Sequence, residues 1–100
     1  MKLTVVCYRT KPEATQENER LIQQVFQELQ AKSLPGVRYL AMRLDDDTFI
    51  HFSTVENGDS PIPKLKAFGL FQSGIKERCV EPPRQSAVTI VGSFRMLGET

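Results

Sequence analysis

Hydrophobic and polar residues alternate along two neighbouring segments near the middle of the chain, residues 40–44 and 49–55. This two-residue period is typical of β-strands, whose side chains point to opposite faces of a sheet in turn. The acidic run Asp45–Asp47 separates the two segments. The stretch Val37–Glu56 therefore predicts a β-hairpin with an acidic turn.

Neither predicted strand has a cleanly polar face. In the second strand, Ile50 and Phe52 share one parity, and Phe49 and Val55 share the other. An antiparallel sheet with one face in water should instead alternate apolar and polar positions. A chain of 100 residues can cover one face with its own helices, so we expect the other face to pack against a second copy. The pattern predicts a homodimer.

A strand and a helix are predicted before this hairpin. β-Branched and aromatic residues indicate a strand over Leu3–Thr10. Pro12 and Glu13 suit the first turn of a helix, and the Pro-Gly pair at 35–36 ends it. The other face of this helix is rich in Gln, Glu and Asn. Its apolar stripe consists of Leu21, Ile22, Val25, Phe26 and Leu29.

A second helix and a last strand are predicted after the hairpin. Ser60 suits an N-cap and Pro61 a first helical position, so we expect this helix to begin there and to run to Cys79. The prolines at 82 and 83 prevent its continuation. Residues Ala87–Met96 are predicted to form the last strand. The apolar stripe of the second helix consists of Leu65, Phe68, Phe71, Ile75 and Cys79.

The predicted order of elements is β-α-β-β-α-β. With right-handed crossovers it gives the ferredoxin-like arrangement, a four-stranded antiparallel sheet with two helices on one face. One hundred residues suit a single α+β domain, 1–100.

The register of the hairpin decides which side chains share a face. A three-residue turn at 45–47 separates the faces by polarity, whereas a two-residue turn mixes them and places His51 among apolar residues. We prefer the three-residue turn for that separation. It gathers Leu40, Met42, Leu44, Ile50 and Phe52 on one face, and Tyr39, Ala41, Arg43, Phe49, His51, Ser53 and Val55 on the other.

The second of these faces carries the candidate chemistry. His51, the single histidine, is the candidate catalytic residue, because imidazole is the side chain that titrates near neutral pH. The alternative is a structural histidine bonded to a neighbouring acceptor. Tyr39, Arg43, Ser53 and Tyr8 are candidate ligand-binding residues on the strands. A lone histidine cannot build a typical metal site, so no metal is expected. No cofactor is expected either.

The charge balance narrows the range of partners. With 13 Lys and Arg against 12 Asp and Glu, the net charge of +1 argues against nucleic acid and membrane surfaces. The first apolar run is too short for a secretion signal, so a cytoplasmic protein is expected. Cys7 and Cys79 lack CxxC spacing and are predicted to be free thiols.

Several segments together resemble the dimeric α+β barrel proteins, and in particular the antibiotic-biosynthesis-monooxygenase-like group. They are YRTKPE, LPGVRY, RLDDDTFIHF, SPIPKLKAFGLFQSGIKERCVEPP and VGSF. The resemblance implies a homodimer with a ligand pocket between helices and sheet. It also implies either oxidation of phenolic or quinoid substrates by molecular oxygen without a cofactor, or binding and degradation of haem.

The chain departs from that group at its catalytic positions. It has no tryptophan, and it has Phe68 and Phe71 where the haem-degrading relatives use a histidine. The resemblance therefore implies a scaffold and a pocket but transfers no catalytic residue. The leading hypothesis is a small-molecule-binding homodimer that acts on an aromatic substrate, with His51 as base and Arg43 as charge stabiliser. The alternatives are a non-enzymatic ligand-binding, stress or regulatory protein and, less favoured, an RNA-binding domain.

Overall fold

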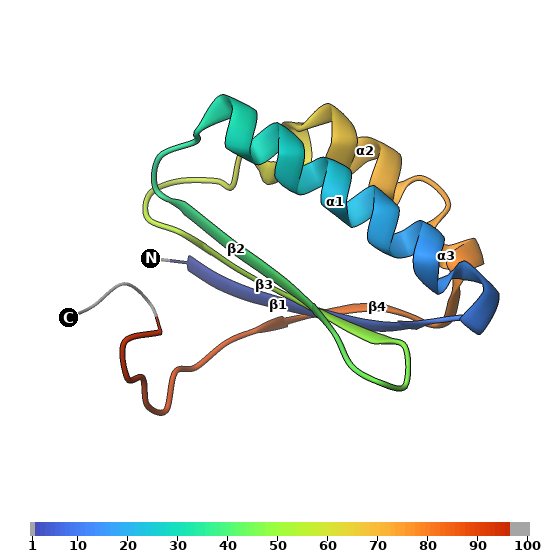
Figure 1. Ribbon diagram of the computed structural model, residues 1–100. Coiled ribbons are helices and arrows are strands. Elements are labelled where there is room, and N and C mark those ends of the chain that lie inside the picture. Colours follow the sequence, from blue (N-terminus) through green and yellow to red (C-terminus); the bar gives the residue numbers. More distant parts are fainter. Residues whose placement is uncertain (1, 97–100) are drawn as a thin grey trace.

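Four antiparallel strands form one sheet in the order β2-β3-β1-β4, and the helices cover one of its faces (Figure 1). The computed structural model describes residues 2–96. This arrangement confirms the predicted α+β, ferredoxin-like fold. The strands are β1 (Lys2–Thr10), β2 (Val37–Arg43), β3 (Thr48–Val55) and β4 (Cys79–Ala87).

The first helix follows the predicted apolar stripe. A 3-10 turn at Pro12–Ala14 leads into α1, Thr15–Lys32. The buried residues of α1 recur at the three- and four-residue spacing of one helical face. The sequence pattern assigned asparagine to the polar face, and this is wrong for Asn18, which is fully buried. The buried residues of α1 are Thr15, Asn18, Ile22 and Val25.

The second helix is not continuous, which corrects the prediction of one helix up to Cys79. A 3-10 turn at Ile62–Lys64 precedes α2, Lys66–Gln72, and the four-residue helix α3 covers Ile75–Arg78. Gly74, between α2 and α3, has a φ of +81°. A left-handed residue breaks the α-helical ladder, and glycine adopts that conformation without steric cost.

The last strand also lies elsewhere than predicted. β4 covers Cys79–Ala87, whereas residues 88–96 form no strand. Pro82 and Pro83, which were predicted to prevent continuation of the second helix, lie within β4. Arg9 pairs with Glu81 and Cys7 with Arg84, so both prolines oppose one residue of β1. Proline has no N–H to donate to a neighbouring strand. A bulge in an edge strand tolerates it because the bulged residues need not donate such a hydrogen bond.

The hairpin has the predicted register. Leu44 N–H donates to the carbonyl of Thr48 at 2.7 Å, which encloses a three-residue turn. Asp47 within this turn has a φ of +67°. Tyr39 pairs with Ser53 and Ala41 with His51, so the mixed polar and aromatic residues share one face, as predicted.

The helices cover one face of the sheet and leave the other bare (Figure 1). The covered face is the mixed one, because its Tyr8, Phe49 and His51 are buried. Cross-strand pairing places two apolar rows on the bare face, across β2, β3 and β1. Leu40 and Met42, at the β2 ends of these rows, are 46% and 41% exposed. The rows are Leu40–Phe52–Val5 and Met42–Ile50–Cys7.

Candidate functional site

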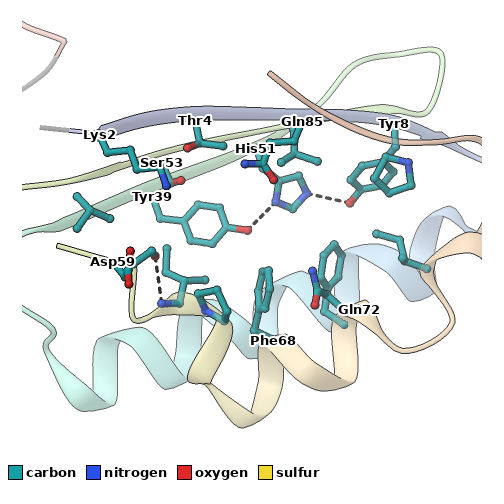
Figure 2. A pocket seen from close by; sticks show the side chains of 18 residues that line it. Lys2, Thr4, Tyr8, Tyr39, His51, Ser53, Asp59, Phe68, Gln72 and Gln85 are labelled. Carbon is teal, nitrogen blue, oxygen red and sulfur yellow. Dashed lines mark hydrogen bonds between the residues drawn. The ribbon is translucent and has the colours of Figure 1, made fainter. Parts of the chain in front are cut away.

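A cavity of about 360 Å³ lies between the covered face of the sheet and α2 (Figure 2). Tyr39, His51 and Ser53 line it from the sheet, and Phe68 lines it from α2. Asp59, in the loop before the helices, also lines the cavity. A volume of this size is within the range of small-molecule sites.

His51 lies between two tyrosine hydroxyls on the sheet side of this cavity (Figure 2). Its Nε2 is 2.8 Å from Tyr8 Oη and its Nδ1 is 2.6 Å from Tyr39 Oη. The pairing of the strands explains the geometry. His51 pairs with Val6 of β1 and Ala41 of β2, and each tyrosine is two residues along its strand from that partner. Both tyrosines are therefore diagonal neighbours of His51 on the same face.

The hydrogen-bonded chain continues into the helices. Asn18 Nδ2 donates to Tyr8 Oη at 2.8 Å, and Arg78 Nε donates to Asn18 Oδ1 at 3.0 Å. The Arg78 guanidinium also donates to the carbonyl oxygens of Phe71, at 2.6 Å, and Ser73, at 3.2 Å. The buried polar groups of the site are thus partnered from two helices as well as from the sheet.

Aromatic rings surround the polar cluster. Phe71 lies with its ring centroid 5.4 Å from that of His51, and Phe68 is 5.8 Å from Phe71. Phe49 stacks on Tyr8 at 5.4 Å with 9° between the ring planes. These contacts fix the rings of the cluster and give the cavity a largely apolar wall.

Glu28 of α1 holds α2 in place over the cavity. Its carboxylate accepts hydrogen bonds from the N–H groups of Ala67, at 2.8 Å, and Lys66, at 3.3 Å. The first N–H groups of a helix have no partner within the helix, so a carboxylate at that end supplies one. Lys32 pairs with the same carboxylate at 3.0 Å.

Burial determines the protonation of the cluster. It lowers the pKa of His51 to about 4, because the charged imidazolium loses its hydration. It also raises the pKa of Tyr8 and of Tyr39 above the usual tyrosine value, since the phenolate is the charged form. At neutral pH the cluster therefore consists of two protonated phenols and a neutral imidazole.

The structure brings together most of the predicted site residues. Tyr8, Tyr39, His51 and Ser53 all line the cavity. Arg43 lies outside it and forms an ion pair with Glu19 of α1 at 2.9 Å, with 47% of its side chain exposed. The role of Arg43 as a charge stabiliser therefore has no geometric support at this cavity.

Two contributors to the cluster were absent from the predicted site, Asn18 and Arg78. A signal for Asn18 was present, because it continues the buried spacing of Ile22 and Val25 by one step toward the N-terminus. A polar residue on that face needs a buried partner. Arg78 had no comparable signal, since it follows the break at Gly74 that the periodicity did not reveal.

Other chemical features of the described residues are few. Among residues 2–96, no three His, Cys, Asp or Glu side chains gather closely enough to hold a metal ion. Cys7 and Cys79 are unpaired and partly exposed. No helix in the described part of the chain has both the length and the apolar character to cross a bilayer.

Comparison with known proteins finds similarity in structure only. Neither the protein-family models nor the curated proteins contain a match. A Nitrosomonas europaea protein provisionally assigned as an antibiotic biosynthesis monooxygenase matches with a TM-score of 0.74 at 13% identity, covering 92% of this chain and 100% of its own. A Caulobacter crescentus protein with the same provisional assignment gives 0.73 at 14% identity and covers 90% and 89%. Rv0793 from Mycobacterium tuberculosis gives 0.71 at 11% identity and covers 91% and 95%.

These structures define the class of fold. The chain has the α+β fold of the antibiotic-biosynthesis-monooxygenase-like proteins, as its sequence predicted. At identities this low, the similarity establishes the fold and leaves the reaction to be argued from the residues of the cavity.

Proposed function

We propose that the protein is a homodimer that binds an aromatic or quinoid small molecule in the cavity beneath α2. The observation that carries this proposal is the cavity of about 360 Å³, with Phe68 and Phe71 in its wall and the Tyr39–His51–Tyr8 cluster on its sheet side. Flat aromatic rings pack favourably against such side chains. A few polar groups inside an apolar wall orient a ligand and supply specificity.

The bare sheet face supports the homodimer. Leu40 and Met42 are exposed there although they belong to continuous apolar rows. Leaving contiguous apolar surface in water is unfavourable, at about 25 cal/mol per Å². A second copy offers the same rows, so a two-fold axis over this face would bury both sets at once.

Ligand binding without turnover fits the cluster best. Both ring nitrogens of His51 are occupied by tyrosine hydroxyls, and burial lowers its pKa to about 4. An imidazole that resists protonation is a weak general base at neutral pH. We therefore infer that ligand binding or sensing, without turnover, is the first candidate for the role of the cavity.

Oxidation of the bound molecule by oxygen without a cofactor is the second candidate. The fold similarity to proteins provisionally assigned as antibiotic biosynthesis monooxygenases favours it. In that reaction a phenolic substrate must lose a proton, because the resulting anion is electron-rich enough to react with oxygen. His51 is the only imidazole available to assist that loss. It would act through Tyr39, and for this route Nδ1 must be the ring nitrogen without a hydrogen.

One set of experiments tests binding and oxidation separately. Equilibrium dialysis with 1,4-dihydroxynaphthalene should show binding that Phe68→Ala weakens several-fold, because an aromatic wall is removed. The matched control is Gln27→Glu on the exposed side of α1. If neither the wild type nor Gln27→Glu binds this compound or other aromatic molecules of similar size, the proposed function is wrong.

Oxygen uptake by the same mixtures decides between the two candidates. Binding with no uptake above the protein-free rate is the result expected for a non-enzymatic protein. Uptake that depends on protein concentration and is lost in His51→Phe would instead establish the oxygenase. Uptake unchanged in His51→Phe would remove His51 from the mechanism.

A further inference from the structure

We propose that a chain of hydrogen bonds runs in one direction from Arg78 to Tyr39 and makes the Tyr39 hydroxyl a donor that selects ligands with an acceptor oxygen. Ketones, quinones and phenolates are ligands of this kind. The inference rests on the proposed function in one respect, that the cavity is the ligand site. The direction of the hydrogen bonds follows from their donors and acceptors within this protein.

The direction is set at Arg78, because a guanidinium can only donate. Its Nε–H points at the side-chain amide of Asn18, at 3.0 Å. The atom that receives it must be the amide oxygen, since an amide nitrogen there would place two donors together. The amide nitrogen of Asn18 is thereby turned to Tyr8 Oη, 2.8 Å away. The two positions of this amide are therefore not interchangeable.

The direction then passes through Tyr8 to His51. Tyr8 Oη accepts the Asn18 N–H, so its own hydrogen remains free to be donated. His51 Nε2, at 2.8 Å, is the nearby acceptor. A neutral imidazole has one N–H and one bare nitrogen. If Nε2 accepts from Tyr8, then Nδ1 carries the hydrogen and donates it to Tyr39 Oη at 2.6 Å.

The opposite direction leaves a buried donor unpaired. If Nε2 carried the hydrogen, Tyr8 Oη would accept from both His51 and Asn18. The Tyr8 hydroxyl hydrogen would then have no acceptor, and Tyr8 is 2% exposed. The Nδ1–H tautomer leaves over the Tyr39 hydrogen instead, but that hydrogen can reach the contents of the cavity. The full cost of one unpaired buried donor would favour the Nδ1–H tautomer by about five- to 150-fold.

The series of hydrogen bonds ends at Tyr39, and the hydrogen of its hydroxyl has no acceptor in the series. Tyr39 Oη makes no second hydrogen bond to any of residues 2–96, and Tyr39 lines the cavity. Its hydrogen is therefore available only to the contents of the cavity. A ligand oxygen that accepts satisfies this donor, whereas a hydrocarbon of the same shape leaves it unpaired.

NMR of the single histidine reads the direction without any ligand. Long-range proton–nitrogen correlations distinguish the two neutral tautomers of an imidazole, and this chain has one histidine to assign. We expect the Nδ1–H tautomer at pH 7. Finding the Nε2–H tautomer would overturn the inference.

The variant Asn18→Asp should reverse the direction of the hydrogen bonds between residue 18 and Tyr39. A carboxylate at this position can only accept, and Arg78 remains beside it to pair with the charge. Tyr8 would then donate toward position 18 and accept from Nε2–H, so the histidine should change to the Nε2–H tautomer. Gln27→Glu adds the same charge to the exposed side of α1 and should keep Nδ1–H. A folded Asn18→Asp protein that keeps Nδ1–H would contradict the proposed direction of the hydrogen bonds. In that proposal Arg78, Asn18 and His51 are positioning residues.

The consequence for ligands is tested with 9-fluorenone and fluorene, two flat molecules that differ by one carbonyl oxygen. Tyr39→Phe should weaken fluorenone binding in equilibrium dialysis about five- to tenfold, the loss of one net hydrogen bond, and change fluorene binding less than twofold. Asn18→Asp should weaken fluorenone binding in the same way, because it turns the Tyr39 hydrogen toward His51. Equal losses for both compounds would overturn the selectivity.

Failure of the inference is distinguishable from failure of the proposed function. If neither compound binds, the proposed function fails and the predicted ligand selectivity fails with it, while the tautomer still decides the direction of the hydrogen bonds. If both compounds bind but the histidine is the Nε2–H tautomer, the inference alone is overturned.

Discussion

Acid should destabilise the protein well above the pH at which its carboxylates titrate, because His51 is buried in its neutral form. Burial lowers the pKa of His51 to about 4, compared with 6.5 for an unperturbed histidine. The unfolded chain therefore takes up a proton as the pH falls through 6.5, and the folded protein does not until about pH 4. Stability that is fully present above pH 6.5 is lost between these two values.

The expected magnitude follows from the two pKa values. Each unit of difference corresponds to 1.36 kcal/mol, so the full loss is about 3 kcal/mol by pH 4 and about 2 kcal/mol at pH 5. The groups in contact with the ring are the hydroxyls of Tyr8 and Tyr39 and the ring of Phe71. Arg78 reaches the ring only through Asn18 and Tyr8. Among residues 2–96 no carboxylate is hydrogen-bonded to His51 to compensate an imidazolium.

Urea denaturation at pH 7 and pH 5 measures this loss. The protein concentration must be the same in both series, since the unfolding of an oligomer depends on it. The matched control is His51→Phe, which keeps a ring of similar size and removes the titration. Its lost hydrogen bonds lower stability equally at both pH values, so they cancel when the difference between pH 7 and pH 5 is taken within each protein.

We expect the free energy of unfolding to fall between pH 7 and pH 5 by about 2 kcal/mol more in the wild type than in His51→Phe. An NMR titration of the histidine Cε1–H should also show no midpoint near pH 6.5 in the folded protein. A midpoint there, or equal differences in the two proteins, would refute the reasoning that burial holds His51 neutral.

Two further predictions concern assembly and backbone conformation. Light scattering should report twice the mass of one chain, and Met42→Glu should shift it toward the single-chain mass by placing a charge in the bare apolar rows; a wild-type particle of single-chain mass would refute the dimer. Gly74→Ala should destabilise the fold by about 1–2 kcal/mol, because its φ is +81°. Gly69→Ala, within α2 and with open space around it, should stabilise it by about 0.5–1 kcal/mol; thermal unfolding that shows the same sign for both would contradict this.

Local pattern determined the hairpin and the first helix. The register of β2 and β3 follows from the polarity of alternate residues and a three-residue turn, which are properties of adjacent residues. The stripe of α1 follows from its helical period. For the same reason, Tyr39, Arg43, His51 and Ser53 lie on the one face that the hairpin register predicted, although Arg43 lies outside the cavity.

The interruptions after the hairpin were harder to place from the sequence. Gly74 interrupts the single helix that the stripe predicted. Pro82 and Pro83 were expected only to prevent that helix from continuing, and they form a bulge in β4. Glycine and proline each occur in several backbone contexts, such as helix ends, turns and bulges. For Pro82 and Pro83, the pairing of β4 with β1 at the edge of the sheet determines that the context is a bulge.

Only the tertiary structure decided which face the helices cover and what His51 contacts. The partners along the polar chain are separated by 10, 43 and 60 residues in sequence, so no local period links them. The mixed face lies under the helices, where Asn18 donates to the buried Tyr8 hydroxyl and Arg78 donates to Asn18. The apolar rows need no such partners, and they were left on the outer face of the sheet.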